Sequence, residues 1–436
     1  MKILLIGNGA REHVIAETLK KNKSTILYSY IKSKNPGIIS LSNGFENGNY
    51  NDLEKIKNYA EKIKPDFAFI GPEDPLGHGV VDSLKKLNIP SVGPTKNLAR
   101  LETSKAFTRN LLRKYKIEGN PRFEIFDKNN IGNARNFIDL LESCVVKPDG
   151  LTGGKGVKVQ GAHFKTKKEA LDYCNEILQI HQYVIVEEKL EGEEFSLQCL
   201  TDGKTVVAMP PVQDHKRAFV DDKGPNTGGM GSYSCENHLL PFLAKKDVEI
   251  GLKITQKVAD AIYKETKEFY KGVMYAGFII TKNGIKLLEY NARFGDPEAM
   301  NVLPLMENDF VEVCSAIISQ QLHKIKIKFQ SKATVCKYLV PNGYPDNPIK
   351  NEKIIVGKTP PNAKLYYASV EQRENSLYTT GSRAIACLGV ADNLEKAEKI
   401  AEQATHSIKG KLFHREDIGT KKLIEKRIKH MKGILG

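Results

Sequence analysis

The sequence has no run of about 18 apolar residues, which is the length that a membrane-spanning helix requires, so no membrane partner is expected. Its opening residues, MKILLIGNGAREH, lack the long apolar core of a cleavable signal, and we expect a mature N-terminus. The seven cysteines include no C-x-x-C pair. Their scatter argues against a disulfide framework or a structural zinc site and indicates reduced thiols in a cytoplasmic protein.

Motifs of nucleic-acid recognition are also missing, although the chain is basic. Its 66 Lys and Arg residues against 52 Asp and Glu residues give a formal net charge of +14. Such a balance suits anionic ligands, nucleic acid among them. However, no zinc finger or aromatic-plus-basic RNA motif occurs, and most lysines fit solvated helix faces. We therefore expect no nucleic-acid partner.

The length and composition are those of a globular protein with several domains. A chain of 436 residues predicts roughly three domains. Apolar strands at 3–6 and 67–70, each followed by a turn and a helix, predict a Rossmann-like parallel-sheet domain over 1–101. A mixed α+β domain is expected over 102–326, and a small α+β domain over 327–436.

Two turns of the first domain carry candidate ligand groups. The motif GNGAREH places Gly9 at the start of a helix, whose free N–H groups can hold an anion. Glu12 stands where a dinucleotide-binding motif has its third glycine, which disfavours NAD and leaves a phosphate-binding or purely structural turn. The motif GPEDPLG places Glu73 at the same cleft mouth, or in a solvated turn, ahead of a helix expected over 78–87. His13 is expected in a turn or at the surface.

The segment VVKPDGLTGGKGV predicts a phosphate-binding lysine and loop. Lys147 ends an apolar strand, which is an expensive place for an unpaired cation. The loop that follows, 150–156, carries Lys155 among four glycines and could fold over a triphosphate. No G-x-x-x-x-G-K-[ST] pattern occurs in the chain, so this is not a Walker A loop. A hairpin loop with a surface lysine is the structural alternative.

Two further segments are rich in charge or glycine. The link EEKLEGEE between two expected strands could bind an adenine edge through its backbone and ribose hydroxyls through a carboxylate, although an acidic hairpin explains it better by itself. The segment QDHKRAF is followed by GPNTGGMG, in which four of eight residues are glycine. So many glycines cost chain entropy, which indicates that something there requires the bare backbone.

The segment LEYNARFGDPE predicts a metal site. Strand alternation places Glu289 and Asn291 on one face, where their oxygens suit Mg²⁺ carrying polyphosphate. Arg293 follows at the strand exit and could clamp a carboxylate substrate. A polar strand end is the structural alternative.

In this order, the motifs resemble those of the ATP-grasp ligases, most closely the phosphoribosylamine–glycine ligase (glycinamide ribonucleotide synthetase) family. The resemblance runs from GNGAREH to REDIGTKKL, and GPNTGGMG and NARFGDPE are its most specific motifs. It implies an ATP-grasp domain over 102–326, with a small flap subdomain at about 120–190. It also implies the ATP-dependent ligation of glycine to 5-phosphoribosylamine through glycyl phosphate, in purine biosynthesis. Another ATP-grasp carboxylate–amine ligase or a carboxylase is the alternative.

The resemblance also assigns roles to single residues. The ATP-binding positions are Lys105, Lys147, Gly153, Gly154, Lys155, Gly156, Glu187, Leu190 and Glu194, and the Mg²⁺ (or Mn²⁺) ligands are Glu289 and Asn291. The catalytic positions are Lys147, Asp214, Lys216 and Arg293. The substrate-binding positions are Gly9, Glu73, Asp214, Asn226, Thr227, Gly228, Gly229, Arg293 and Asp296. The partners are then the small molecules ATP, glycine and phosphoribosylamine, and the chain a monomer or weak homodimer.

The sequence departs from the usual family pattern in two places. Pro148, Thr152 and Gly153 alter the glycine-rich loop, and Pro148 predicts a stiffer base for it. The stretch 366–383 is looser than the family form.

Overall fold

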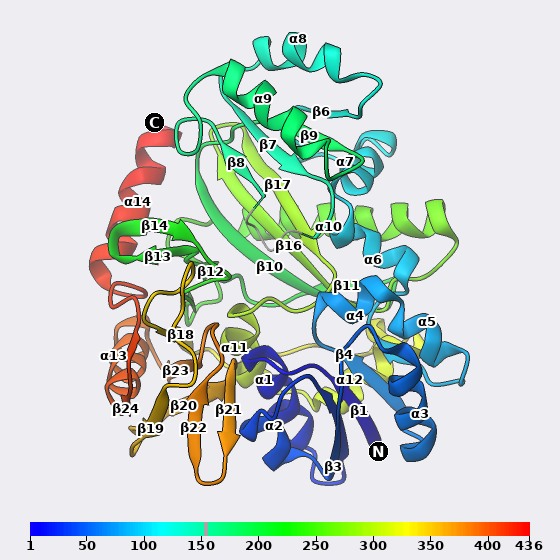
Figure 1. The fold of residues 1–436 in the computed structure, drawn as a ribbon, viewed down its shortest axis with the longest axis vertical. Helices are drawn as coiled ribbons and strands as arrows, with labels where there is room; N and C mark the ends of the chain where they lie inside the picture. The colour runs from blue at the N-terminus through cyan, green and yellow to red at the C-terminus, as the bar shows by residue number, and fades with distance from the viewer. Residues whose placement is uncertain (152–155) are drawn as a thin grey trace.

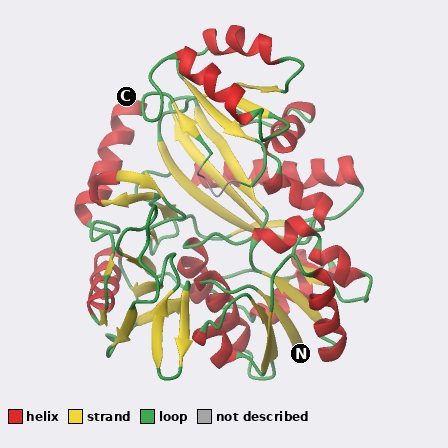
Figure 2. Ribbon diagram, in the orientation of Figure 1, coloured by secondary structure: helices red, strands yellow, loops and turns green. Residues whose placement is uncertain are grey.

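The computed structural model describes residues 1–151 and 156–436, and its parts meet around a central sheet (Figure 1). The loop positions Gly153, Gly154 and Lys155 lie outside the described residues. Figure 2 shows strands and helices mixed throughout, in keeping with the α/β and α+β class expected from the sequence. No helix in the described ranges is long and apolar enough to cross a membrane.

The N-terminal part is a parallel sheet with the strand order β3-β2-β1-β4-β5, which confirms the expected strand–helix alternation. Its strands are β1 (Lys2–Ile6), β2 (Ile26–Ile31), β3 (Gly44–Asn47), β4 (Phe67–Ile70) and β5 (Ser91–Val92). Its helices are α1 (Ala10–Lys20), α2 (Pro36–Leu41), α3 (Leu53–Ile63), α4 (Glu73–His78) and α5 (Val80–Lys85). Strand β4 and residues 3–6 of β1 are continuous apolar runs because both faces of the sheet are covered.

The helix expected over 78–87 is present as α5 (Val80–Lys85), but the structure has a further helix before it, α4, which begins at Glu73. Pro72 is the N-cap of α4, and Glu73 and Asp74 occupy its first turn. Acidic side chains are favourable there because the helix N-terminus carries free N–H groups and a partial positive charge. Glu73 therefore lies at a helix start directly after β4.

His13 is buried within α1, so the expectation of a turn or surface position is wrong. Its Nδ1 accepts a hydrogen bond of 3.0 Å from the backbone N–H of Tyr367, and the two rings stack. Burial lowers the pKa of His13 to about 4. The neutral ring thus joins the C-terminal part to the first helix.

The centre of the molecule is an antiparallel sheet with the order β11-β10-β16-β17. Its strands are β10 (Glu193–Thr201), β11 (Val206–Ala208), β16 (Gly272–Thr281) and β17 (Gly284–Asn291). Helices α6 (Lys96–Thr103) and α7 (Lys105–Lys114) lead into this region. Helix α10 (Lys245–Thr266) packs on the strands of this sheet, and α11 (Glu298–Val302) and α12 (Phe310–Ser319) follow β17 in the chain. The core of this sheet is continuous with that of the N-terminal part.

A small lobe packs above the central sheet in Figure 1. Its sheet has the order β6-β9-β7-β8 and is built from β6 (Phe123–Phe126), β7 (Cys144–Pro148), β8 (Lys158–Val159) and β9 (Val184–Glu188). The helices α8 (Ala134–Asp139) and α9 (Lys167–Ile177) belong to the same lobe. The lobe has its own hydrophobic cluster, separate from the main core.

The C-terminal sheet has the order β12-β15-β18-β23-β20, so it includes two strands from the middle of the chain. These are β12 (Gln213–Asp214) and β15 (Gly231–Ser234); the others are β18 (Ala333–Pro341), β20 (Ala363–Tyr367) and β23 (Ile385–Ala391), with β25 (Leu412–Phe413) beside β18. A second sheet contains β19 (Lys353–Val356), β21 (Val370–Arg373), β22 (Ser376–Thr379) and β24 (Ile408–Lys409). The remaining elements are the hairpin β13 (Arg217–Phe219) and β14 (Lys223–Asn226), and helices α13 (Leu394–His406) and α14 (Lys421–Leu435).

Candidate active site

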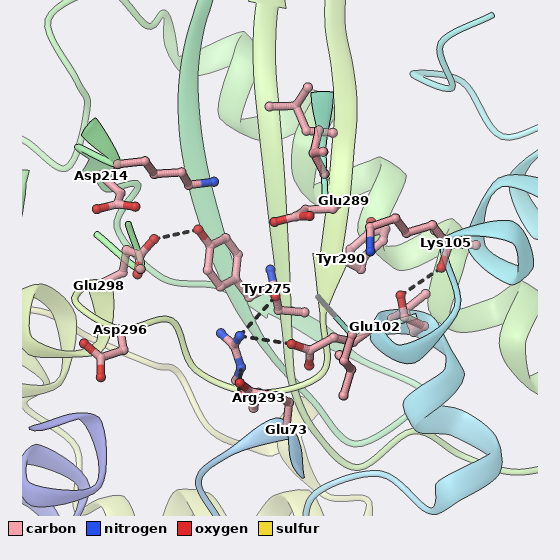
Figure 3. A pocket seen from close by; sticks show the side chains of 18 of the residues that line it. Glu73, Glu102, Lys105, Asp214, Tyr275, Glu289, Tyr290, Arg293, Asp296 and Glu298 are labelled. Atoms are coloured by element: carbon pink, nitrogen blue, oxygen red, sulfur yellow. Dashed lines mark hydrogen bonds and ion pairs between the residues drawn. The ribbon is translucent and has the colours of Figure 1, made fainter. Parts of the chain in front are cut away.

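A cavity of about 310 Å³ lies where the three parts and the small lobe meet. Twelve of the residues singled out in the sequence line it: Glu73, Lys105, Lys147, Glu187, Asp214, Lys216, Thr227, Gly228, Glu289, Asn291, Arg293 and Asp296. Figure 3 shows the labelled carboxylates and Lys105 around one shared space. Segments more than 200 residues apart in sequence are therefore combined in one site.

Glu289 lies within the electrostatic influence of four cations, three of them lysines. It lies on β17, two residues before Asn291, so both side chains leave the same face of the strand. Burial raises the pKa of Glu289, but nearby ammonium groups outweigh burial and hold it below its usual value. The ammonium groups, from largest effect to smallest, belong to Lys216, Lys105 and Lys147. An ionised carboxylate facing three lysines is an arrangement suited to a metal ion and a polyanion together.

Lys147 is held by a buried carboxylate of the neighbouring strand. Its Nζ lies 2.7 Å from Oε2 of Glu187. Glu187 also forms an ion pair with Arg109. The Nε and Nη2 atoms of Arg109 lie 2.6 and 3.0 Å from the two carboxylate oxygens of Glu187. Burial raises the pKa of Glu187, but Arg109 and Lys147 lower it to about 2. The strand-end lysine that the sequence marks as costly is thus paired, and its direction is fixed.

Lys105 joins the main body to the base of the glycine-rich loop. It is the first residue of α7, and its Nζ donates 2.9 Å to the carbonyl oxygen of Gly150. Asp149 accepts from Ser104 Oγ at 3.0 Å and from the backbone N–H of Ala106 at 3.1 Å. The loop base is therefore anchored at the start of a helix.

Asp214 and Lys216 flank the buried His215 at the end of β12. Burial raises the pKa of Asp214 well above its usual value, and the carboxylate of Glu298 adds to the rise. Burial lowers the pKa of Lys216, but surrounding carboxylates, Glu194 foremost, raise it overall. The surroundings thus shift Asp214 toward its neutral form and Lys216 toward its charged form, relative to the same groups in water.

The glycines of GPNTGGMG are required by protein packing. A Cβ on Gly229, whose φ is +113°, would lie 2.6 Å from Oδ1 of Asp214. A Cβ on Gly231, with φ +152°, would lie 2.2 Å from the carbonyl oxygen of Cys336 on β18. Asn226 ends the strand β14, and Thr227 donates its backbone N–H to the Lys216 carbonyl at 2.7 Å. The loop therefore packs directly on the Asp214 segment.

Arg293 already has protein partners. Its Nε lies 3.0 Å from Oε2 of Glu73, and its Nη2 lies 3.0 Å from Oε1 of Glu102 and 3.2 Å from Oδ1 of Asn291. Glu102 also accepts the backbone N–H of Ala292 at 2.7 Å. Arg293 thus connects the N-terminal part to the end of β17, and Figure 3 shows its bond to Glu102.

Gly9 lies beside the cavity, but its N–H is occupied. Oε2 of Glu12 accepts the N–H groups of Gly9 at 2.5 Å and of Asn8 at 3.2 Å. This carboxylate occupies the helix N-terminus that a dinucleotide phosphate would need, which is consistent with the low expectation for NAD. A Cβ on Gly9 would lie 3.6 Å from Oδ2 of Asp296, so the residue is close to the lining.

Three further positions are less central. Gly156, Leu190 and Glu194 are not among the residues that line the cavity in the described part of the chain. Glu194, on β10, is nevertheless the carboxylate with the largest effect on Lys216. Leu190 lies in the link between β9 and β10, as the motif EEKLEGEE predicts.

The structure adds lining residues that the sequence did not single out. The main additions are Arg11, Glu102, Arg109, Tyr275, Glu298 and Arg383. Tyr275 donates 2.6 Å to Oε1 of Glu298. Arg11, Glu298 and Arg383 lie inside or at the end of segments already quoted, whereas Glu102 and Arg109 lie on helices with no motif.

Arg383 is the contribution of the C-terminal part to the site. Its Nη1 donates to the carbonyl oxygens of Gly228, Gly229 and Asp296 at 2.8, 3.0 and 2.9 Å. Its guanidinium lies 4.5 Å from the ring centroid of Tyr338. One cation therefore fixes the glycine loop against the segment that follows β17.

Replacing Arg383 with methionine should loosen that loop while the chain stays folded. Hydrogen bonds from a charged donor contribute about 1.5–3 kcal/mol, so protection of the Met230 amide against hydrogen exchange should fall ~10–100-fold. Arg373→Met is the matched control, because that arginine is half exposed on β21 of the same domain. Equal protection in both variants would contradict the anchoring role of Arg383.

Comparison with known proteins places the whole chain in one group. Family models described as the N domain, the ATP-grasp (A) domain and the C domain of phosphoribosylglycinamide synthetase match residues 1–102, 103–299 and 334–421. A phosphoribosylamine–glycine ligase of Methanocaldococcus jannaschii is 51% identical, with 99% of each chain covered.

Solved structures agree. A crystal structure of phosphoribosylamine–glycine ligase from Thermotoga maritima has a TM-score of 0.80 at 26% identity, covering 96% of this chain and 100% of that one. The biotin carboxylase domain of Hydrogenobacter thermophilus 2-oxoglutarate carboxylase, in complex with MgADP, ADP and bicarbonate, has a TM-score of 0.73 at 14% identity, covering 99% of this chain and 93% of that one. At that identity only the fold is shared.

Proposed function

Since the chain belongs to the phosphoribosylglycinamide synthetase family, we propose that its cavity ligates glycine to 5-phosphoribosylamine at the expense of ATP. The products are glycinamide ribonucleotide, ADP and phosphate, a step of purine biosynthesis. The observation that carries the proposal is the position of Glu289, which shares one cavity with Lys105, Lys147 and Lys216. A carboxylate surrounded by phosphate-binding cations is what ATP-dependent activation of an acid requires.

The ATP-grasp family uses ATP with a divalent metal, and the residues at the end of β17 fit that ion. Glu289 and Asn291 present a carboxylate and an amide oxygen, the hard ligands that Mg²⁺ and Mn²⁺ prefer. Asn291 Oδ1 accepts a hydrogen bond of 3.2 Å from Nη2 of Arg293, which restricts the orientation of the amide. When bound there, the ion would neutralise charge on the polyphosphate. We propose Mg²⁺, with Mn²⁺ as the substitute.

The chemistry follows from the weakness of a free carboxylate as an acyl donor. The glycine carboxylate attacks the γ-phosphorus of ATP, giving glycyl phosphate and ADP. The amine of phosphoribosylamine then attacks the acyl carbon, phosphate leaves, and an amide forms. Lys147 and Lys216 lie where they can stabilise the charge on the moving phosphoryl group.

The remaining roles are proposals of the same kind. Adenosine would be bound by Glu187, Leu190 and Glu194, and the phosphates by Lys105, Lys147 and the loop 153–156. The two smaller substrates would be bound by Asp214, Asn226, Thr227, Gly228, Gly229, Arg293 and Asp296, with Gly9 and Glu73 on the phosphoribosylamine side. Because Glu73 forms an ion pair with Arg293, a glycine carboxylate that binds this arginine must replace or share that contact.

The proposal includes a cytoplasmic monomer or weak homodimer that acts on small molecules and not on nucleic acid. All seven cysteines are free and buried, which supports a reducing compartment.

The test is an ADP-release assay from which glycine and phosphoribosylamine are omitted in turn. We expect ADP release to require glycine, and stoichiometric amide formation to require both. The rival ATP-grasp activity, a carboxylase, would release ADP with bicarbonate and without glycine. That result would overturn the proposed function.

A further inference from the structure

Three side chains that can bind a metal ion converge on the C-terminal domain, and none of them lines the central cavity. Glu402 and His406 lie one turn apart on α13, and His414 directly follows β25. Nε2 of His406 lies 3.2 Å from Oε1 of Glu402, and Nε2 of His414 lies 3.1 Å from the same oxygen. All three ligand atoms lie within 4.8 Å of one another.

We propose that Glu402, His406 and His414 bind one divalent ion of the borderline class, such as Zn²⁺, a site separate from the ligase chemistry. In a tetrahedral site with bonds of about 2.0–2.1 Å, neighbouring donor atoms lie ~3.3 Å apart. The two measured separations are close to that value. Two imidazoles and one carboxylate are the ligand set that Zn²⁺, Co²⁺ and Ni²⁺ prefer over Mg²⁺. Because the site contains no cysteine, the cysteine spacing could not reveal it.

The carboxylate of Glu402 is already oriented for this role. The fully buried Lys337 places its Nζ 2.5 Å from Oε2 of Glu402 and 2.7 Å from Oε1 of Glu398. Oε1 of Glu402 lies near both histidines, and Oε2 also lies 3.2 Å from Nε2 of His414. Such outer contacts are what fix the ligands of metal sites. One ammonium between two carboxylates also leaves one negative charge, which a bound cation would balance.

The position is accessible to an ion from solvent. The His406 side chain is 67% exposed, whereas that of His414 is 12% exposed. Water can therefore supply the fourth ligand on the His406 side. The end of α13 that carries His406 leads into β24 (Figure 1).

A bound ion would tie α13 to the segment that follows β25. Lys337 lies on β18, opposite Gly231 in the register, and the next residue, Tyr338, donates 2.6 Å to Oδ1 of Asp296 in the cavity. The ion would therefore brace the far side of the strand that supports the glycine loop. Its expected effect is on stability, because an ion that binds only the folded chain raises the unfolding temperature.

The experiment uses the full-length chain without a histidine tag, stripped with EDTA and kept in excess Mg²⁺ so that the cavity is saturated. Zn²⁺ alone is then titrated by calorimetry. We expect one Zn²⁺ per chain, a higher Tm with Zn²⁺, and an affinity ~10–100-fold weaker in His406→Ala, since even outer contacts of metal sites contribute that much. His406 is exposed, so the variant should fold, and metal-free variants should keep the Mg²⁺-dependent ADP release of the parent.

His414→Ala should weaken Zn²⁺ binding in the same way. His323→Ala is the matched control, because that histidine is exposed and lies elsewhere. The control should bind Zn²⁺ like the parent chain. A parent chain that takes up no stoichiometric Zn²⁺, or a His406→Ala variant that binds it unchanged, overturns the site. Neither result bears on the proposed ligase.

Discussion

Replacing Glu289 with alanine is expected to lower glycine-dependent ADP release about 1,000-fold while the protein remains folded. The change removes the anionic ligand of the proposed metal site and the carboxylate that faces Lys105, Lys147 and Lys216. Metal stabilisation of transition-state charge amounts to several kcal/mol, and about 4 kcal/mol corresponds to 1,000-fold in rate. The measurement is steady-state ADP release at saturating ATP over a range of Mg²⁺ concentrations.

Two companion variants make this test specific. Glu289→Gln keeps the size and loses the charge, so it should recover part of the activity at high Mg²⁺ or Mn²⁺. Glu312→Ala, on the first turn of α12, is the distant control and should behave as the parent chain. If Glu289→Ala turns over normally at moderate Mg²⁺, the metal assignment is wrong.

The second large effect is on stability. Replacing Glu187 with glutamine should destabilise the chain by about 3–5 kcal/mol, because it leaves the buried cations Arg109 and Lys147 without their shared carboxylate. Equilibrium urea unfolding at pH 7 measures the loss. Glu124→Gln is the matched control on the neighbouring strand β6; its ion pair with Arg113 is exposed, so it should cost at most about 1 kcal/mol. Similar losses in both variants would contradict the importance of the buried pair.

The same carboxylate predicts a pH dependence. A pKa lowered from 4.5 to about 2 means that the folded state favours the ionised form of Glu187. Its stabilising contribution is therefore complete above pH 4.5 and is lost as the pH falls toward 2. The parent chain should lose stability over this range by about 3 kcal/mol more than Glu187→Gln.

The sequence predicts site residues that lie within a single segment, but it does not predict which residues of other segments pair with them. Glu289 and Asn291 follow from strand alternation, and Lys147 from its place at a strand end. Its partner Glu187 lies on another strand, and nothing local specifies that β7 and β9 pair with Lys147 opposite Ile185. Pairing register is a long-range property, so the resemblance assigns the backbone of Glu187 to adenine but says nothing of its carboxylate, which pairs with Lys147.

Other omissions have the same origin. Glu102 and Arg109 lie on amphipathic helices, where a buried charge cannot be told from a solvated one until the helix is packed. The inclusion of β12 and β15 in the C-terminal sheet joins segments about 100 residues apart. Arg383 reaches the glycine loop only through that sheet. The helix start at Glu73, in contrast, can be predicted from the sequence, because acidic residues in the first turn are typical of a helix N-terminus.

The separate hydrophobic cluster of the small lobe has a consequence for how the enzyme can open. The lobe buries its apolar side chains mostly among themselves, with a minor cluster of Ala106, Phe123 and Ile185 at its boundary. Tilting the lobe therefore exposes little apolar surface to water. The contacts that hold the lobe on the rest of the molecule include the ion pair between Arg109 and Glu187 and the hydrogen bond from Lys105 to the carbonyl oxygen of Gly150. Opening of the lobe is thus opposed by a small number of polar contacts, and the triphosphate of the proposed nucleotide substrate would compete for their cations with its own negative charge.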